Sequence, residues 1–301
     1  MNKDALAQHL EKLRIFAIVA KQGAFHKASR ELRISQPALS RSIATLESII
    51  MKKLLIRSVK GVSLTEEGKL LLSLYEKIEA SIDDINEKIS SGNHPYAGEL
   101  KVASYETLVT YLWPDFLKHF TKEHPELKIN LITRNEKDHW SKLASGTLDV
   151  IVDAEPQVGP QWDSHVLYTD TFNLYVSKKY DEATPVKNII YVEKAYDENS
   201  LSIRDHFVKN DVQFSESYKL DTFISVKAFT LAGLGIGVLP ERLAIADLKS
   251  GNLKKIPLKG ISNKGFGKHR ICFSQTQQGR SDLRVKLLHQ ELKKYLQKSE
   301  T

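Results

Sequence analysis

The sequence lacks the features that mark secreted and membrane proteins. It has one cysteine among 301 residues, so no disulfide can form within the chain. It has no run of about 18 apolar residues, the length that a transmembrane helix requires. Its first residues, MNKDALAQHLEKL, contain neither the apolar stretch nor the small-residue cleavage site of a secretory signal. We therefore expect a cytoplasmic protein that does not associate with a membrane.

The residue patterns of common catalytic and metal sites are also missing. The ten histidines form no His-Glu-x-x-His pair, which argues against a zinc site, and there is no Gly-x-Ser-x-Gly nucleophile turn. The glycine run Gly233–Gly237 does not follow a strand and open a helix, as a dinucleotide-binding loop must. The single thiol, Cys272, stands in the apolar run Arg270–Ser274 and is expected to pack inside a strand. We expect no enzyme activity, no metal and no cofactor.

Excess positive charge is confined to the beginning of the chain. Residues 1–60 contain 12 Lys and Arg against 4 Asp and Glu, a net charge of +8, whereas the remainder has 32 against 33, a net charge of −1. A basic segment attached to a neutral body is typical of a nucleic-acid-binding module. The alternative is a solvated charged surface, which gives the same count.

Three helices are predicted within this basic segment. Apolar residues at helical spacing predict the first from Ala7 to Gln22 and a very short second one from Phe25 to Leu32. The third begins in the stretch ISQPALSRSIATLE, Ile34 to Glu47. There Ser35 can cap the helix, and Pro37 lies in the first turn, where its missing amide hydrogen removes no helical bond.

The third helix has a buried face and a polar face. Leu39, Ile43 and Leu46 recur at spacings of four and three and form the buried stripe. Two short helices of this kind are typical of a helix-turn-helix, whose second helix enters the major groove of DNA. Gln36 can bridge N6 and N7 of adenine, and Arg41 can pair with guanine or with a phosphate. The alternative is that both are ordinary surface residues of a three-helix core.

The segment that follows the third helix resembles the wing of a winged helix. Four basic residues lead to Gly61–Thr65, a glycine turn with strand-like flanks that would lie against phosphates beside the groove. We expect Ser40, Arg57 and Lys60 to position the protein on DNA rather than to read its sequence. The predicted DNA-binding residues are Ser35, Gln36, Pro37, Ser40, Arg41, Arg57 and Lys60.

The run FAIVAKQGAFHKASRELRISQPALSRSIATLE, together with LLIRSVKGVSLTEEGKLLL, resembles the N-terminal signature of the LysR-type transcriptional regulators. Ala28, Leu32 and the segment Ser35–Ser40 carry the core of that signature. The chain departs from the family where Gly, Phe and Glu are usual; these positions are Met51, Leu55 and Ile56. The resemblance implies a winged helix-turn-helix, a linker helix and a two-lobed α/β effector-binding domain with the fold of periplasmic binding proteins.

One long helix is predicted from Thr65 to the break SSGNHPYAG, Ser90 to Gly98. Thr65 can cap it, and no proline occurs before Pro95. Its apolar residues recur at spacings of three and four, as in a coiled coil; they are Leu71, Leu74, Ile78, Ile82, Ile85 and Ile89. The stripe outruns the core of a small N-terminal domain, so we expect it to contact a second chain, although packing on its own domain is the alternative. By resemblance, this is the linker through which two chains dimerise.

Strand-like and helix-like segments alternate beyond Gly98, which predicts parallel sheets in two α/β lobes. A helix is expected near Tyr111 to Glu123. The segments LASGTLDVIVDA and AGLGIGVLPERL stand where the family's effector-binding domain has characteristic segments. The resemblance implies a ligand between the lobes and a hinge of two crossing segments, Tyr168 to Leu174 and Lys268 to Phe273. The expected domains are 1–64 for DNA binding, 65–92 for the linker and 98–301 for effector binding.

In open α/β sheets, ligands bind at the carboxyl ends of strands, where helix N-termini present free amides. The turn Ser104–Thr107 closes the first strand of this region, and Arg134 follows the second. Arg134 can pair with a ligand carboxylate or be an ordinary surface charge, while Glu106 and Asp197 are compatible with an amine-bearing ligand. The predicted effector-binding residues are Ser104, Tyr105, Glu106, Thr107, Arg134, Asn135, Asp153, Asp197 and Ser225.

Three functions fit the sequence: a ligand-responsive transcription factor, a DNA-architectural protein without a ligand, and an enzyme tethered to DNA. The location of the charge, the helix-turn-helix and the resemblance favour the first. Its expected partners are an operator in double-stranded DNA, a small-molecule effector and further copies of the chain in a dimer or tetramer. RNA polymerase is a further partner if the protein activates transcription.

Overall fold

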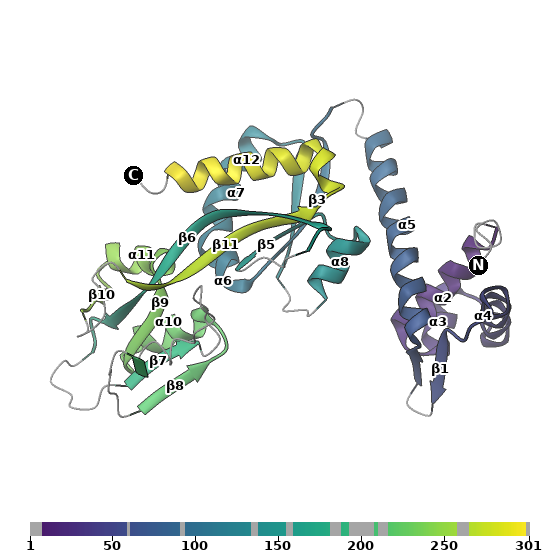
Figure 1. The fold of residues 1–301 in the computed structure, drawn as a ribbon, viewed down its shortest axis with the longest axis horizontal. Helices are drawn as coiled ribbons and strands as arrows, with labels where there is room; N and C mark the ends of the chain where they lie inside the picture. The colour runs from purple at the N-terminus through teal and green to yellow at the C-terminus, as the bar shows by residue number, and fades with distance from the viewer. Residues whose placement is uncertain are drawn as a thin grey trace. The chain divides into compact units, whose positions relative to one another are not determined.

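The computed structural model describes residues 8–58, 61–90, 94–133, 138–154, 159–180, 188–192, 208–209, 216–257 and 265–298. The chain folds into two compact units (Figure 1). The N-terminal unit comprises Met1–Asn93 with Trp140–Thr147, and the C-terminal unit comprises His94–His139 with Leu148–Thr301. Within these described stretches, no helix is long and apolar enough to span a membrane.

Three short helices open the N-terminal unit, as the sequence predicts, but the first begins at Leu10 and not at Ala7, because Gln8 and His9 form a turn. They are α2 (Leu10–Gln22), α3 (Phe25–Leu32) and α4 (Gln36–Ile50). Helix α2 ends where Gly23 adopts a left-handed φ of 64°, and α3 ends where Arg33 adopts a φ of 55°. Helix α4 begins at Ser35, whose hydroxyl accepts a hydrogen bond from the Ala38 amide at 3.4 Å. The predicted cap is confirmed, and Pro37 lies in the first turn.

These helices are held together by one apolar core. The predicted stripe of Leu39, Ile43 and Leu46 is fully buried and packs with Phe16 of α2. Complete burial of a side chain of this size stabilises the fold by about 1.5–3 kcal/mol. Burial of the stripe therefore compensates for the low intrinsic stability of such short helices. Leu55, at a position where the family usually has Phe, is also buried in this core.

Two strands form the wing. Strands β1 (Leu55–Ser58) and β2 (Gly61–Leu64) pair in an antiparallel manner. The Val62 amide donates to the Gly23 carbonyl at 2.8 Å, which ties the wing to the end of α2. Gly61 has a φ of 123°, and a Cβ there would lie 2.6 Å from the Gly23 oxygen. This close approach requires glycine.

Helix α5 (Glu66–Ser90) is the predicted long helix. Its first turn is capped as expected, because the Thr65 hydroxyl accepts from the Gly68 amide at 3.0 Å. The first half of the apolar stripe packs on the core of its own unit; these residues are Leu71, Leu74 and Ile78. The second half is more than half exposed in the single chain; these residues are Ile82, Ile85 and Ile89. Contact of the stripe with a second chain stays a prediction, and in the single chain its first half already packs on the core of its own unit.

A single sheet runs through the described part of the C-terminal unit, in the order β4-β3-β5-β11-β6-β9-β7-β8, with β10 paired to β6. Parallel pairs β3–β4 and β3–β5 make one lobe, and parallel pairs β7–β8 and β7–β9 make the other. The strands are β3 (Gly98–Ser104), β4 (Leu127–Ile132), β5 (Val150–Ala154), β6 (Trp162–Ser177), β7 (Asn188–Val192), β8 (Glu216–Leu220), β9 (Ile236–Pro240), β10 (Leu253–Lys255) and β11 (Phe266–Thr276). The predicted two-lobed α/β architecture is confirmed.

Strands β6 and β11 cross from one lobe to the other (Figure 1). They pair in an antiparallel manner from Trp162 opposite Thr276 to Phe172 opposite Phe266. The crossing segments expected from the resemblance lie within these two strands. Cys272 of β11 is buried, opposite Val166 of β6, as the sequence predicts for a packed strand thiol.

Helices flank the two lobes, and two of them differ from expectation. They are α6 (Glu106–Tyr111), α7 (Trp113–Glu123), α10 (Phe223–Leu231), α11 (Glu241–Lys249) and α12 (Leu283–Lys298), with a short 3-10 helix η1 (Gly279–Ser281). Helix α8 (His139–Ser145) falls, from Trp140 on, in the N-terminal unit. The single helix expected near Tyr111 is two helices, divided at Leu112. Pro114 explains the division, because it cannot donate a helical hydrogen bond and is tolerated only in a first turn.

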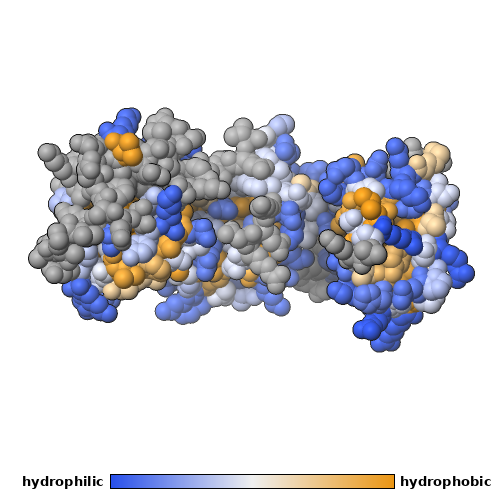
Figure 2. Space-filling model, turned by 90° about the horizontal axis from the view of Figure 1, so that it is seen from below, coloured by the Kyte–Doolittle hydropathy of each residue, from blue (hydrophilic) through white to orange (hydrophobic). Residues whose placement is uncertain are grey.

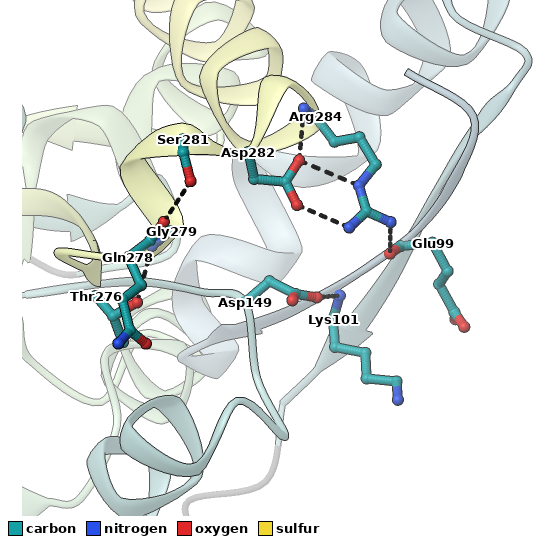
Figure 3. A network of polar contacts seen from close by, with 9 residues as sticks. All are labelled: Glu99, Lys101, Asp149, Thr276, Gln278, Gly279, Ser281, Asp282 and Arg284. Atoms are coloured by element: carbon teal, nitrogen blue, oxygen red, sulfur yellow. Dashed lines mark hydrogen bonds and ion pairs between the residues drawn. The ribbon is translucent and has the colours of Figure 1, made fainter. Parts of the chain in front are cut away.

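Helix α12 is fastened to the first lobe by a buried arginine (Figure 3). Arg284 donates through Nε and Nη2 to the Asp282 carboxylate, at 3.1 and 2.7 Å, and through Nη1 to the Glu99 carbonyl at 3.4 Å. Beside it, the Asp149 carboxylate accepts from the Lys101 amide at 2.7 Å (Figure 3). A fork-shaped guanidinium–carboxylate pair fixes orientation as well as distance. The C-terminal helix therefore belongs to the lobe that contains β3.

Replacing Met51 by glycine should stabilise the N-terminal unit. Met51 ends α4 in the left-handed region, with φ 56° and ψ 32°, and its side chain is 82% exposed. An L residue in this region carries strain of about 1–2 kcal/mol, which burial does not offset here. We expect Met51→Gly to raise the free energy of unfolding by about 0.5–1 kcal/mol in urea denaturation. Met51→Ala keeps the Cβ and should give no such gain; an equal gain from alanine would contradict the explanation.

Candidate DNA interface and effector site

The N-terminal end of α4 presents polar side chains to solvent. Gln36 and Arg41 are exposed, whereas Leu39 and Ile43 between and beyond them are fully buried. Figure 2 shows hydrophilic residues around the edge of the N-terminal unit, on the right as in Figure 1, with hydrophobic residues nearer the centre of this face. Side chains at the start of a recognition helix are the ones that reach base edges in a major groove. The geometry of α4 allows this role.

An arginine of the wing links the wing to α4. Arg57 donates through Nη2 to the Ser40 hydroxyl at 3.1 Å, and its guanidinium lies 4.4 Å from the centre of the Phe25 ring. Such a cation–π contact contributes about 0.5–1 kcal/mol at an exposed site. The structure thus brings together Ser40 and Arg57, both predicted to contact DNA. Lys60 lies outside the described residues.

Glu47 fastens the start of the wing to the other end of α4. Its carboxylate accepts from the Leu54 amide at 2.9 Å, the Leu55 amide at 3.4 Å and the Lys53 ammonium at 2.7 Å. Burial alone would raise the pKa of Glu47, but these hydrogen bonds outweigh it and lower the pKa below its usual value. The sequence gives no signal for these roles of Glu47 and Phe25, because both depend on partners in another element.

At the predicted effector turn, Ser104 and Thr107 point into the first lobe. Each is only 1% exposed. The Ser104 hydroxyl donates to the Val152 carbonyl at 2.9 Å and accepts from Trp113 Nε1 at 3.0 Å, so it joins β3 to β5 and to α7. These two side chains hold the turn in place and offer a ligand very little surface. Glu106 of the same turn is exposed.

One predicted effector residue, Tyr105, contacts a histidine that is not among the predicted site residues. The Tyr105 hydroxyl lies 3.2 Å from His269 Nε2 on β11. The His269 ring also packs against Phe223, the first residue of α10, with centroids 5.6 Å apart. In the same first turn of α10, the Ser225 amide donates to the hydroxyl of the N-cap residue, Thr222, at 3.2 Å. The turn after β3 and the N-terminus of α10 therefore converge on His269, whose only sequence signal was its place in a predicted crossing segment.

Burial controls the charges near this point. It raises the pKa of Asp153 to about 6 and that of Asp170 to about 6, and it lowers the pKa of His269 to about 4. The effect of burial on the pKa of Asp170 is partly offset, because its carboxylate accepts a hydrogen bond from the Arg242 amide at 3.0 Å. Near neutral pH, His269 is uncharged and both carboxyl groups are mostly ionised. Their buried negative charges lower the stability of the folded state. Arg134, Asn135 and Asp197 lie outside the described residues.

Two family models match the chain. The model described as "Bacterial regulatory helix-turn-helix protein, lysR family" matches residues 10–69, and the model described as "LysR substrate binding domain" matches residues 93–297. The first match covers the three short helices, the wing and the start of α5. The second covers the sheet with both lobes and nearly all of α12.

Individual relatives are similar over most of their length. The chain is 25% identical over 268 residues to a probable RuBisCO transcriptional regulator of Thalassiosira pseudonana, covering 84% of this chain and 87% of that one. It is 25% identical over 280 residues to the HTH-type transcriptional regulator YybE of Bacillus subtilis, covering 89% of each.

Two solved structures share the fold of the whole chain. A full-length OxyR variant from Pseudomonas aeruginosa superposes with a TM-score of 0.62 at 18% identity, covering 95% of this chain and 93% of that one. Full-length LysG from Corynebacterium glutamicum, with bound effector Arg, gives 0.61 at 18% identity, covering 94% and 97%. At this identity, the likeness concerns the fold.

Removing the charge of Asp153 should stabilise the C-terminal unit near neutral pH. Because the folded-state pKa of about 6 lies above the ordinary value of 3.8, the contribution of this group is most favourable below about pH 4 and is lost as pH rises through about 6. Asp153→Asn should therefore raise the free energy of unfolding by about 1–2 kcal/mol near pH 7.5 and by less near pH 5. Urea denaturation at the two pH values measures the difference.

Asp163→Asn is the matched control. Hydrogen bonds from Arg280, Gln275 and His165 hold the pKa of Asp163 below its usual range, so its ionised form is stabilised by folding. This variant should lose stability at neutral pH. If Asp153→Asn also loses stability, or gains equally at both pH values, burial of the Asp153 charge is not the controlling factor.

Proposed function

This chain belongs to the LysR family of transcriptional regulators, and we propose that it reads its operator with Gln36 and Arg41 of α4. It is a DNA-binding transcriptional regulator with an effector-binding domain, and not an enzyme. The exposed N-terminal end of α4 is the observation that supports these DNA-contacting roles. The wing lies beside it, because Arg57 of the wing donates a hydrogen bond to Ser40 of α4. This arrangement supports a division between base reading and phosphate positioning.

In this division, Gln36 pairs with adenine, and Arg41 pairs with guanine or a phosphate. Ser40, Arg57 and Lys60 contact the DNA backbone. Arg57 has five N–H donors and uses one of them on Ser40, which leaves others to donate to phosphate oxygens. Ser35 and Pro37 set the start of α4 at the groove.

Members of this family form oligomers, and we propose that the exposed half of the α5 stripe joins two chains. Ile82, Ile85 and Ile89 are apolar and exposed in the single chain, whereas Leu71, Leu74 and Ile78 already pack on the DNA-binding core. A dimer presents two recognition helices to two half-sites, as operator symmetry requires. Pairing of dimers into a tetramer and contact with RNA polymerase, in an activator, belong to the same proposal.

The effector is proposed to bind where the two lobes approach each other around the crossing strands. Tyr105, Glu106, Asp153 and Ser225 would contact it, with His269 between Tyr105 and α10. Ser104 and Thr107 would shape the turn, and Arg134, Asn135 and Asp197 remain proposed contacts. The contact between Tyr105 and His269 supports this assignment. We place the protein in the cytoplasm, where a DNA-binding regulator meets its operator.

Gln36→Ala should weaken sequence-specific binding selectively. Loss of a bidentate base contact costs about 1–3 kcal/mol on the correct site. The wild-type chain would first select its preferred duplex from a random library, and affinities for that duplex and for random DNA would then be measured at one salt concentration. The variant should bind random DNA nearly as well as the wild type. Lys60→Ala, which removes only a positive charge, should weaken both; equal weakening by Gln36→Ala would assign Gln36 to the DNA backbone.

Ile85→Asp should separate the dimer without unfolding the DNA-binding core. A carboxylate buried in an apolar interface without a partner is costly, but Ile85 is exposed in the single chain and is not part of the core. We expect a monomer by light scattering and a loss of affinity for the two-half-site operator. Asn86→Asp, about 100° round the helix, adds the same charge beside the stripe and should remain dimeric. A dimer of the Ile85→Asp chain would place the interface elsewhere.

A further inference from the structure

A set of metal-ligand side chains lies at the end of α7, on elements that the proposed effector and DNA sites do not use. Glu123 is the last residue of α7, His124 is its C-cap, and Glu291 belongs to α12, which packs against α7. One ligand atom from each of the three lies within 4.8 Å of the other two. The absence of spaced histidines in the sequence predicted no metal, whereas tertiary packing brings Glu291 to the Glu123–His124 pair.

The imidazole of this set is held in place. The His124 ring packs against Phe120, with centroids 5.0 Å apart. His124 Nδ1 also lies 3.8 Å from Glu126 Oε1, so a third carboxylate stands beside the ring. Carboxylates next to a ligating histidine orient the ring and raise its basicity. The C-terminal end of α7 adds the negative pole of the helix, which favours a cation.

A cavity of about 310 Å³ adjoins the set. Glu123 and Glu291 both line it, and Phe116, Phe120 and Tyr295 provide apolar wall. Three protein ligands leave part of a metal coordination sphere for water, and the cavity has the volume for it. Lys294 also lines the cavity, with its ammonium 3.4 Å from Glu291 Oε1. Glu291 therefore already forms an ion pair with a cationic group.

We propose that Glu123, His124 and Glu291 bind a divalent transition-metal ion, with zinc as the best match. One imidazole nitrogen and two carboxylate oxygens suit Zn²⁺, which takes both donor types at about 2.0–2.2 Å, whereas sites for Mg²⁺ and Ca²⁺ use oxygen alone. Glu123 is exposed, so its side chain has room to approach an ion. The ion would cross-link α7 to α12 on the outside of the first lobe and would be distinct from the effector.

The test is calorimetric titration of the metal-free, full-length wild-type chain with Zn²⁺. One ion should bind per chain, and His124→Gln or Glu291→Gln should each weaken the binding at least about tenfold. His119→Gln is the matched control, because His119 lines the same cavity without belonging to the ligand set, and its affinity should equal that of the wild type. With Co²⁺ as the probe, the wild type should show a visible d–d absorption that His124→Gln loses.

Lys294→Gln provides an independent check on Glu291. Removing the competing ammonium should tighten Zn²⁺ binding, provided that Glu291 is a ligand. The proposal is overturned if the wild type shows no saturable binding, if His119→Gln weakens binding as much as His124→Gln, or if Lys294→Gln leaves the affinity unchanged or lowers it. Circular dichroism of each variant would verify that an altered affinity reflects a lost ligand in a folded chain.

Discussion

The antiparallel pairing of β6 with β11 is the contact on which the C-terminal unit depends. Each strand supplies apolar side chains to the cores of both lobes: Tyr168 and Ile271 to the first, Phe172 and Phe266 to the second. Neither lobe can complete its core without these strands, which enter it at widely separated points of the chain. The same pairing places His269 between Tyr105 of one lobe and Phe223 of the other. The proposed effector site is therefore built on the two strands that join the lobes.

In the N-terminal unit, side-chain contacts hold the short helices and the wing together. Helices of 8 and 15 residues are marginal by themselves, and the buried face of α4 makes them stable. Glu47 and Arg57 then fix the wing at the two ends of that helix, one through backbone amides and the other through Ser40 and a ring. The polar face that the proposal assigns to DNA is thus left with its backbone fixed and its side chains exposed.

Buried ionisable groups near the crossing strands carry a cost that an apolar core would avoid. Asp153 and Asp170 have a pKa of about 6 because burial disfavours their charge, and His269 is kept neutral for the same reason. Groups of this kind collect where a protein must recognise a polar ligand. Their position between the lobes agrees with the proposed effector site, and the zinc site proposed at α7 and α12 lies on other elements.

The sequence by itself determined the elements whose signals are local. The bounds of α3, the start of α4 at Ser35 and the stop at Gly23 follow from caps, proline and helical spacing, which act over a few residues. The charge of residues 1–60 located the DNA-binding unit in the same way. Only the tertiary structure decided how the α5 stripe divides after Ile78, that the Ser104 hydroxyl is used within the first lobe, and that Glu291 meets His124. Each of these features depends on a partner far along the chain. The periodicity of a sequence shows which side chains are apolar or polar, but it does not show which residues they will contact.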